Sequence, residues 1–487
     1  MMAWKVYRRR VWMVFSALIV IVMIVLCSAC QKKTTPSVTH PTSLTQSHVD
    51  ILTPESSNDI DPNAPLNTWD NVTHSIVEQM QSQGFSKNNI SRSMSSNLSE
   101  QVKKLKKIVS NVSTSTEKNS HILLFSPALD EDSPRSAAIR HRYGDLVTST
   151  ATIADNSDDD NTDILDTLVE QLRKAQKAGI TVVLMGQKIP NFAENYYVSF
   201  STAQSVARIQ TENLVKKLQL NKATAQNPQA IEMLLPMNVG KEFNEQAFAA
   251  SWKILKPYFV TGVAYSPSGL LDAHTTAQDW RNVAVSDDSE SSISDALQAR
   301  LSSSQNTNAR IDGIIAFNDY AAHHVIRALK NMGYTGSSAT INPDITLESI
   351  VKTLAGDADV NKQRVPMPTS PEDEETDTTG SDKSSATKKT SLTWPIITSF
   401  GVYINDVPHI ITGKLWTSSM EDRADISESV ALLCAQIAQG RTGARLERSI
   451  PNVRSTTLTT ALFAVSADNL KKTLIDTSYI TPADAGL

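Results

Sequence analysis

The chain is poor in cysteine and glycine and has no excess of basic residues. Its 487 residues include only three cysteines, Cys27, Cys30 and Cys434, which are too few for a disulfide framework. The 17 glycines and 20 prolines exclude a collagen-like or wholly low-complexity chain. Acidic residues outnumber Lys and Arg by 51 to 46, which argues against a basic nucleic-acid-binding protein. Because 40% of the residues are hydrophobic, we expect folded domains and not disorder throughout.

The first thirty residues carry an export signal. The basic segment MMAWKVYRRR precedes an uncharged apolar run over residues 11–26, and small residues follow it. This order of a charged region, an apolar region and a cut site predicts a signal peptide over residues 1–29. The sequence Cys27-Ser28-Ala29-Cys30 resembles a bacterial lipobox with Cys27 in place of the usual Leu, which implies a lipid anchor on Cys30.

An uncleaved membrane helix is the alternative interpretation of this N-terminal segment. No charge occurs between Val11 and Gln31, and such a run is long enough to cross a bilayer core of about 30 Å. In both interpretations the arginines at positions 8–10 stay inside and the body of the chain is exported. Residues 30–47 are rich in Ser, Thr and Pro and predict a flexible tether to the outer face of the cytoplasmic membrane.

From residue 48 onward, short apolar or β-branched runs alternate with amphipathic helical stretches. This alternation is typical of an α/β protein with parallel sheets covered by helices. More strands are predicted than one ordinary sheet holds, so we expect two doubly wound lobes. The predicted strands are 49–54, 89–94, 121–127, 180–186, 196–200, 230–236, 312–318 and 396–399.

Two acidic segments interrupt this alternation. Residues 155–166 hold six aspartates, and residues 369–389 are acidic and rich in Ser and Thr. Both predict solvated loops, and the second predicts disorder, because it has few apolar side chains to bury. A calcium site in the first loop is an alternative, although the loop lacks the Gly and the final Glu of an EF-hand.

Five segments, in order, resemble the type I periplasmic sugar-binding proteins of ABC transporters, closest to the xylose- and multiple-sugar-binding members. They are residues 68–85, 175–189, 254–259, 311–334 and 465–480. The resemblance implies an exported, non-enzymatic receptor that closes two lobes on a sugar by hinge motion and presents it to an ABC permease. It implies no cofactor and no metal.

The resemblance also implies where the chain crosses between the lobes. The crossings would fall near residue 200, near 416–420 and near 458. One lobe would then hold residues 48–200 and 420–457, and the other would hold 201–419 and 458–487. Residues 337–393 read as an insertion, partly disordered, within the second lobe.

The family pattern points to three ligand-contacting positions that are kept here. Trp69 matches an aromatic position that would stack on a sugar ring. Asn318 and Asp319 follow the apolar strand at 312–318, where side-chain oxygens would accept hydrogen bonds from sugar hydroxyls. The alternative for Trp69 is a core tryptophan at a helix start, and the alternative for the Asn-Asp pair is a helix cap.

Other positions depart from the family pattern. Gln187 and Lys188 stand where the family typically has an Asp-Arg pair, and they keep hydrogen-bonding capacity without the guanidinium fork. Asp344 is a reserve candidate for a carboxylate that the pattern expects elsewhere. We therefore interpret the ligand as a sugar or a related small polar molecule. The alternative is a sensory or scaffold lipoprotein that keeps the fold without a ligand.

Other functional classes find little support in the sequence. It has no nucleophile elbow, no HExxH motif and no phosphate-binding glycine loop. His323 and His324 are adjacent on a predicted helix and so do not form an i, i+4 metal pair. Cys434 lies in an apolar helix, which predicts a buried, inert thiol. A sugar-responsive repressor would carry a helix-turn-helix where this chain has an export signal.

Overall fold

The computed structural model describes residues 42–56, 61–114, 119–128, 134–148, 159–289, 291–302, 308–343, 345–347 and 392–487. Thr42–Leu487 form one compact unit. The predicted signal peptide, Cys30, Asp344 and most of the predicted insertion lie outside the described residues. Within the described ranges, every helix is too short or too polar to cross a bilayer.

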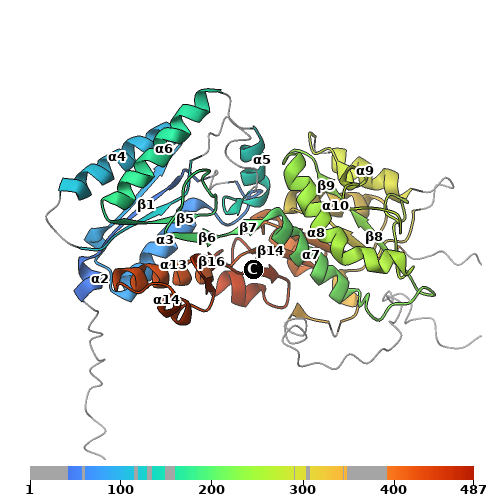
Figure 1. The fold of residues 1–487 in the computed structure, drawn as a ribbon. Coiled ribbons are helices and arrows are strands. Elements are labelled where there is room, and N and C mark those ends of the chain that lie inside the picture. Colours follow the sequence, from blue (N-terminus) through green and yellow to red (C-terminus); the bar gives the residue numbers. More distant parts are fainter. Residues whose placement is uncertain are drawn as a thin grey trace, which may run out of the picture. The chain divides into compact units, whose positions relative to one another are not determined.

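The first lobe is built on a seven-stranded sheet in the order β15-β16-β6-β5-β3-β1-β2 (Figure 1). All neighbours in it run parallel except β15 and β16. Its central strands β3 and β5 are almost wholly apolar because helices cover both faces. The strands are β1 (His48–Pro54), β2 (Ile90–Ser95), β3 (His121–Phe125), β5 (Ile180–Met185), β6 (Tyr196–Ser199), β15 (Val453–Arg454) and β16 (Thr457–Thr459).

Two separate apolar cores lie on the two faces of this sheet. Helices α3 (Trp69–Gln83) and α13 (Arg423–Ala438) pack together over one face. Helices α4 (Leu98–Thr114) and α6 (Asp159–Lys177) cover the other. Gly84 ends α3 with φ of 108°, the left-handed conformation of a C-cap glycine. The short helices α2 (Thr42–Gln46), η2 (Lys87–Asn89) and α14 (Ala444–Ser449) complete the lobe.

The second lobe is built on a six-stranded sheet in the order β10-β8-β12-β13-β14-β17. Only β17, at the edge, runs antiparallel to its neighbour. The strands are β8 (Gln229–Met233), β10 (Ala264–Tyr265), β12 (Gly313–Ile315), β13 (Ile396–Phe400), β14 (Thr417–Glu421) and β17 (Leu462–Val465). Two parallel-dominated sheets with helices between their strands confirm the predicted α/β fold class of two doubly wound lobes.

Helices also cover both faces of the second sheet. One core includes side chains of α7 (Ala203–Lys217) and α8 (Lys241–Val260), and the other includes those of α9 (Ser292–Leu301) and α10 (Asp319–Asn331). The apolar residues at 258–265 suggest an extended stretch from the sequence; this is wrong in its first half, since α8 runs through Pro257 to Val260. Shorter elements are β9 (Leu235–Pro236), η4 (Trp280–Asn282), β11 (Ala284–Val285), η5 (Ser338–Thr340), η7 (Ile404–Asp406), α12 (Val407–Ile411) and η8 (Lys471–Ile475).

The chain passes between the sheets three times. It leaves the first sheet after β6, returns after β14 and leaves again after β16. The short strands β4 (Val147–Thr148) and β7 (Ser201–Thr202) pair with one another next to the first crossing. If each strand is assigned to the lobe of its sheet, the three crossings fall within a few residues of the predicted positions. All of β14 then belongs to the second lobe, and β16 belongs to the first. The lobe boundaries themselves stay a prediction.

The two ends of the predicted insertion lie side by side. The amide of Thr335 donates to the carbonyl of Leu392 at 2.8 Å, and the amide of Trp394 donates to the carbonyl of Thr335 at 2.7 Å. Trp394 is fully buried and its indole donates to the carbonyl of Lys414 at 2.9 Å. An insertion whose ends are held together in this way adds chain without displacing the strands on either side of it.

Candidate functional site

Asn318 begins helix α10 at the carboxyl end of β12. Its Oδ1 accepts a hydrogen bond from the amide of Ala321 at 2.9 Å, which is the helix-cap role considered from the sequence. Phe317, just before it, has φ of 64°, a left-handed conformation that is costly for a bulky side chain. Both Asn318 and Asp319 are completely buried.

Asp319 bonds to the neighbouring strands β13 and β14 and to the turn that follows β13. Its carboxylate accepts hydrogen bonds from the hydroxyl of Ser399, from the hydroxyl of Ser418 at 2.7 Å and from the amide of Tyr403 at 2.8 Å. Burial, together with the nearby Asp406 carboxylate, raises the pKa of Asp319 to about 7. The side chain therefore fixes the turn after β13, and a role for it in ligand contact stays a prediction.

Gln187 and Lys188 follow β5, at the carboxyl edge of the first sheet. Lys188 lies 3.2 Å from Glu194 and 4.7 Å from the centre of the Tyr197 ring, and its side chain is 62% exposed. Gly186 before them has φ of 76°, and a Cβ atom there would lie 3.1 Å from the side chains of Phe200 and Thr148, a tight contact in a strained backbone conformation. The partners of Lys188 belong to its own lobe, and ligand contact for Gln187 and Lys188 stays a prediction.

Trp69 is the first residue of α3 and is 3% exposed. Its ring lies 5.8 Å from that of Phe200 at a tilt of 60°, and its amide donates to Asp145 at 2.9 Å. It is thus a core residue of the first lobe, as in the alternative interpretation. Because Phe200 directly precedes the first crossing, Trp69 also lies close to the place where the lobes join. Stacking on a ligand stays a prediction.

A buried polar group that the sequence did not predict lies at this place; we call Asn67, Ser201 and Glu421 the junction cluster. Asn67 donates to the backbone carbonyl of Glu421 at 2.8 Å and to its carboxylate at 3.3 Å. Asn67 Oδ1 and Glu421 Oε1 are both buried, and neither has a hydrogen-bond partner within normal distance and angle limits. The hydroxyl of Ser201 nevertheless lies close enough to the Glu421 carboxylate to lower its pKa. Burial has the larger effect and raises that pKa.

Residues 139–143, at the C-terminal end of α5 (Pro134–Tyr143), insert between the lobes; we call them the wedge. Arg142 lies 3.4 Å from the centre of the Tyr320 ring and 3.6 Å from the fully buried carboxylate of Asp287. The hydroxyl of Tyr403 donates to the backbone carbonyl of Arg142 at 2.9 Å. The wedge belongs to the first half of the chain, and these three partners belong to the second lobe.

Tyr143 fills the apolar part of the same contact. Its ring is 1% exposed and lies 4.7 Å from Phe243 and 6.3 Å from Phe400. Burial raises the pKa of its hydroxyl, which faces Asn318. The wedge therefore touches the segments that follow β11, β12 and β13, where open α/β sheets bind ligands. The sequence did not predict it, because PRSAAIRHRY has neither a strong apolar periodicity nor a known motif.

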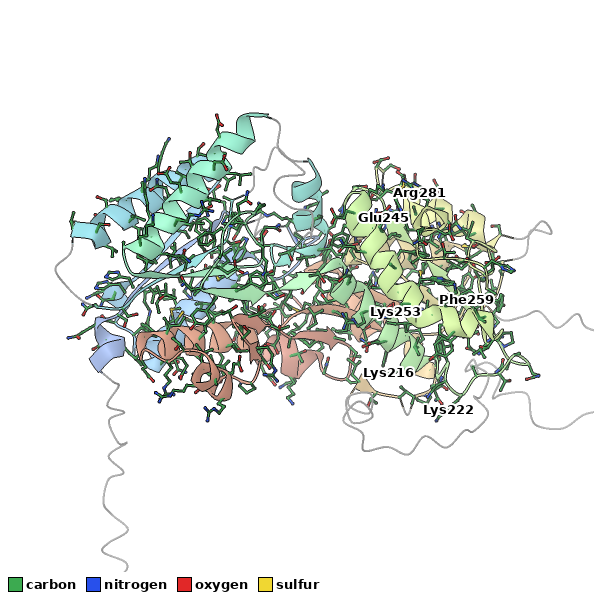
Figure 2. The ribbon with its side chains drawn as sticks, viewed as in Figure 1. Lys216, Lys222, Glu245, Lys253, Phe259 and Arg281 are labelled. Carbon is green, nitrogen blue, oxygen red and sulfur yellow. The ribbon has the colours of Figure 1, made fainter. Side chains whose placement is uncertain are left out.

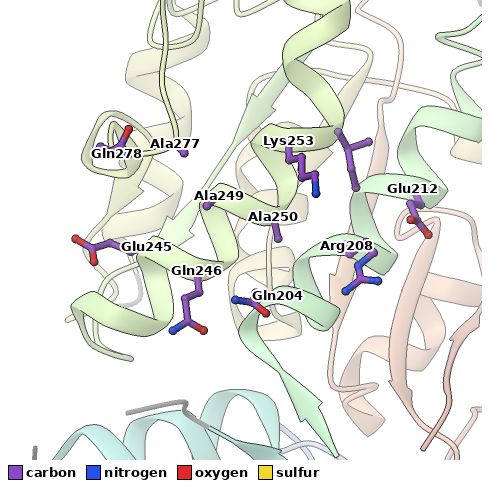
Figure 3. Close-up of a pocket in the computed structure, with 11 residues that line it drawn as sticks. Gln204, Arg208, Glu212, Glu245, Gln246, Ala249, Ala250, Lys253, Ala277 and Gln278 are labelled. Atoms are coloured by element: carbon purple, nitrogen blue, oxygen red, sulfur yellow. The ribbon is translucent and has the colours of Figure 1, made fainter. Parts of the chain in front are cut away.

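A separate groove of about 870 Å³ lies on the second lobe between α7 and α8 (Figure 3). Arg208 and Glu212 of α7 face Gln246 and Lys253 of α8 across it. Figure 2 shows Glu245 and Lys253 along α8 in the same part of the lobe. The predicted ligand residues do not line this groove. Its walls carry charges of both signs and give no indication of an occupant.

Cys434 is completely buried in α13, and burial raises the pKa of its thiol. The predicted burial of this residue is confirmed. Of the remaining candidates, Cys30 and Asp344 lie outside the described residues.

Residues 165–361 match a family model described as a periplasmic binding protein domain. The match confirms the predicted resemblance to periplasmic binding proteins over this part of the chain. No curated protein matches the chain.

Several solved structures resemble the fold at low sequence identity. An ABC transporter solute-binding protein from Clostridium phytofermentans with bound β-D-glucose is 17% identical, covering 90% of this chain and 99% of its own, with a TM-score of 0.46. A carbohydrate transporter solute-binding protein from Chloroflexus aurantiacus in complex with D-glucose is 14% identical, covering 90% and 98%, with a TM-score of 0.46. The arabinose-binding protein AraP from Geobacillus stearothermophilus is 10% identical, covering 88% and 100%, with a TM-score of 0.45.

Proposed function

From the periplasmic binding protein domain that residues 165–361 match, we propose that this chain is the extracytoplasmic substrate-binding component of an ABC transporter. Its ligand is a sugar or a related small polar molecule bound between the lobes. Cys30 carries the lipid that holds the protein at the outer face of the cytoplasmic membrane, and an ABC permease receives the ligand.

The junction cluster is the observation that carries this proposal. Buried polar atoms in proteins almost always have a partner, and those without one mark places where water or a ligand binds. Asn67 Oδ1 accepts hydrogen bonds and so does Glu421 Oε1, and both are buried. Ligand hydroxyls donate to such atoms. The aromatic pair of Trp69 and Phe200 lies nearby; it is buried in this arrangement and would offer an apolar face to the C–H groups of a sugar only once the lobes separate.

Ligand entry requires the lobes to separate, because the wedge fills the contact between them. Arg142 and Tyr143 would leave the second lobe as the first lobe turns away about the three crossings. Hinge motion of this kind is the usual way in which two-lobed binding proteins open. A ligand then has to replace the contacts that the wedge makes to Asp287, Tyr320 and Tyr403 in the closed form.

A ligand screen tests the proposal. The full chain in detergent is mixed with monosaccharides and oligosaccharides, and unfolding is followed by tryptophan fluorescence. A ligand at 100 times its Kd should stabilise the folded state by about 2.7 kcal/mol, because it binds only that state. Glu421→Gln should reduce the shift, whereas the matched control Glu170→Gln, whose partner Lys174 lies on the exposed face of α6, should leave it unchanged.

The outcomes separate the proposal from its alternative. A stabilising ligand whose effect Glu421→Gln reduces supports a receptor. A broad screen without any stabilising compound, on protein that unfolds cooperatively, would favour the sensory or scaffold lipoprotein. Lipid attachment is checked independently by the mass of the N-terminal peptide, since a modified Cys30 would begin the mature chain.

A further inference from the structure

Three potential metal ligands from three elements converge on the second lobe. His323 lies on α10, Asp406 ends η7, and His409 lies on α12. Each offers one ligand atom, and the three atoms lie within 4.8 Å of one another. His323 Nδ1 is 3.0 Å from Asp406 Oδ1, and the rings of His323 and His409 are 5.9 Å apart.

We propose that His323, Asp406 and His409 bind a divalent transition-metal ion of the zinc class. Two imidazoles and a carboxylate form a common zinc ligand set, with a fourth position left for water. With bond lengths of about 2.0 to 2.2 Å, the ligand atoms of a tetrahedral zinc ion lie roughly 3.3 Å apart. The separation of 3.0 Å between His323 and Asp406 is close to this value, and the three ligand atoms, within 4.8 Å of one another, would have to draw together by roughly 1.5 Å or less.

The burial and bonding of these side chains fit a metal site. Asp406 is 1% exposed, and a buried carboxylate needs a cation or hydrogen-bond donors beside it. Within the described part of the chain, neither ring nitrogen of His409 has a hydrogen-bond partner, so its imidazole is available to a metal. His323 stands beside Asp406 and remains 43% exposed, which leaves a path for an ion from solvent.

Neighbouring charges set the expected strength of the site. Arg327, Lys330 and Lys414 lie close enough to act electrostatically on the two histidines, and they oppose a cation. The buried Asp319 carboxylate, behind Asp406, favours it. With three cations against one additional carboxylate, we expect affinity well below that of structural zinc sites, and strengthening at high ionic strength as the exposed lysines are screened.

The site would hold a loop that contacts the other lobe. Asp406 lies in the segment that carries Tyr403, whose hydroxyl donates to Arg142 of the wedge. In the same segment, the side chain of Asn405 donates to that of Asn63 at 2.8 Å. A metal bound at Asp406 would restrain this segment and thereby favour the closed arrangement of the lobes.

The test measures metal binding directly, without reference to any organic ligand. The full chain is purified in detergent without a histidine tag and titrated with Zn²⁺ by calorimetry and with Co²⁺ by visible absorption. We expect one ion per chain and the absorption bands of a low-coordinate Co²⁺ site. His323→Gln and His409→Gln should each weaken binding at least tenfold, while His324→Gln should leave it unchanged.

Two further controls separate this site from other outcomes. His48 and His121 stack at 4.9 Å in the first lobe and are another histidine pair that could take up an ion, so His121→Gln should leave binding unchanged. Circular dichroism verifies that each variant folds. Absence of binding, or equal losses in His324→Gln and His409→Gln, would overturn the proposal. Since ligand binding is measured separately, failure here leaves the proposed receptor function standing.

Discussion

The contact of Arg142 with Asp287 offers a direct test of how the lobes are held together. Replacing Arg142 with Ala removes its ion pair with Asp287 and its contact with the Tyr320 ring. Both partners belong to the second lobe. The substitution should therefore lower the free energy of unfolding and also increase the population of molecules with separated lobes.

The size of the effect follows from burial. The side chain of Asp287 is fully buried and that of Arg142 is 13% exposed, so removing the arginine leaves a buried carboxylate without its cation. Such a loss costs about 3 to 5 kcal/mol, and the separation of 3.6 Å places this pair near the lower end. A desolvated cation–π contact adds about 2 kcal/mol. In a protein that already carries Asp287→Asn, no buried carboxylate is left without its cation when Arg142 is removed. We therefore expect Arg142→Ala to cost only the cation–π contact there, about 2 kcal/mol.

A double-mutant cycle in urea measures this coupling, and distances between spin labels on the two lobes report their separation. The expected coupling between Arg142 and Asp287 is about 3 kcal/mol, the difference between the costs of Arg142→Ala in the two backgrounds. Arg92→Ala is the control, because the ion pair of Arg92 with Asp70 is half exposed and within one lobe, where such pairs contribute about 0 to 1 kcal/mol. If Arg142→Ala costs no more than Arg92→Ala and shows no coupling, the wedge does not hold the lobes together.

Three further predictions concern single sites. The pKa of Asp319 is about 7 in the folded protein, against an ordinary value of 3.8. The folded state therefore binds the proton of this carboxyl group more tightly than the unfolded state does. The resulting contribution to stability is present below about pH 4 and is lost as the pH rises to 7. Urea unfolding should therefore show that the cost of Asp319→Asn falls by about 1.4 kcal/mol per pH unit across that window, and a constant cost would contradict the assigned pKa. Gly186→Ala should cost about 1 to 3 kcal/mol more than Gly179→Ala, because both glycines have positive φ but only Gly186 faces Phe200; equal melting temperatures would contradict this. Cys434 should react with iodoacetamide only after unfolding, as mass spectrometry of its peptide will show, and fast labelling of the native protein would disprove its burial.

The sequence was sufficient for most of the long elements and for the α/β fold class of two doubly wound lobes. Apolar strands that alternate with amphipathic helices form parallel sheets with helices on both sides, because both faces of each sheet must be buried. Local chemistry was also readable: Gly84 ends a helix, Asn318 begins one, and Cys434 is buried. These features depend on residues within a few positions of one another.

The contacts between the lobes were decided only by the tertiary structure. The wedge around Arg142, the junction cluster around Glu421 and the pairing of His323 with His409 each join segments that are far apart in the chain. Their formation depends on the order of strands in each sheet and on the three crossings, and local periodicity carries no information about which loops meet. The sequence therefore paired His323 only with its neighbour His324. The fold instead brings Asp406 Oδ1 to 3.0 Å from His323 Nδ1.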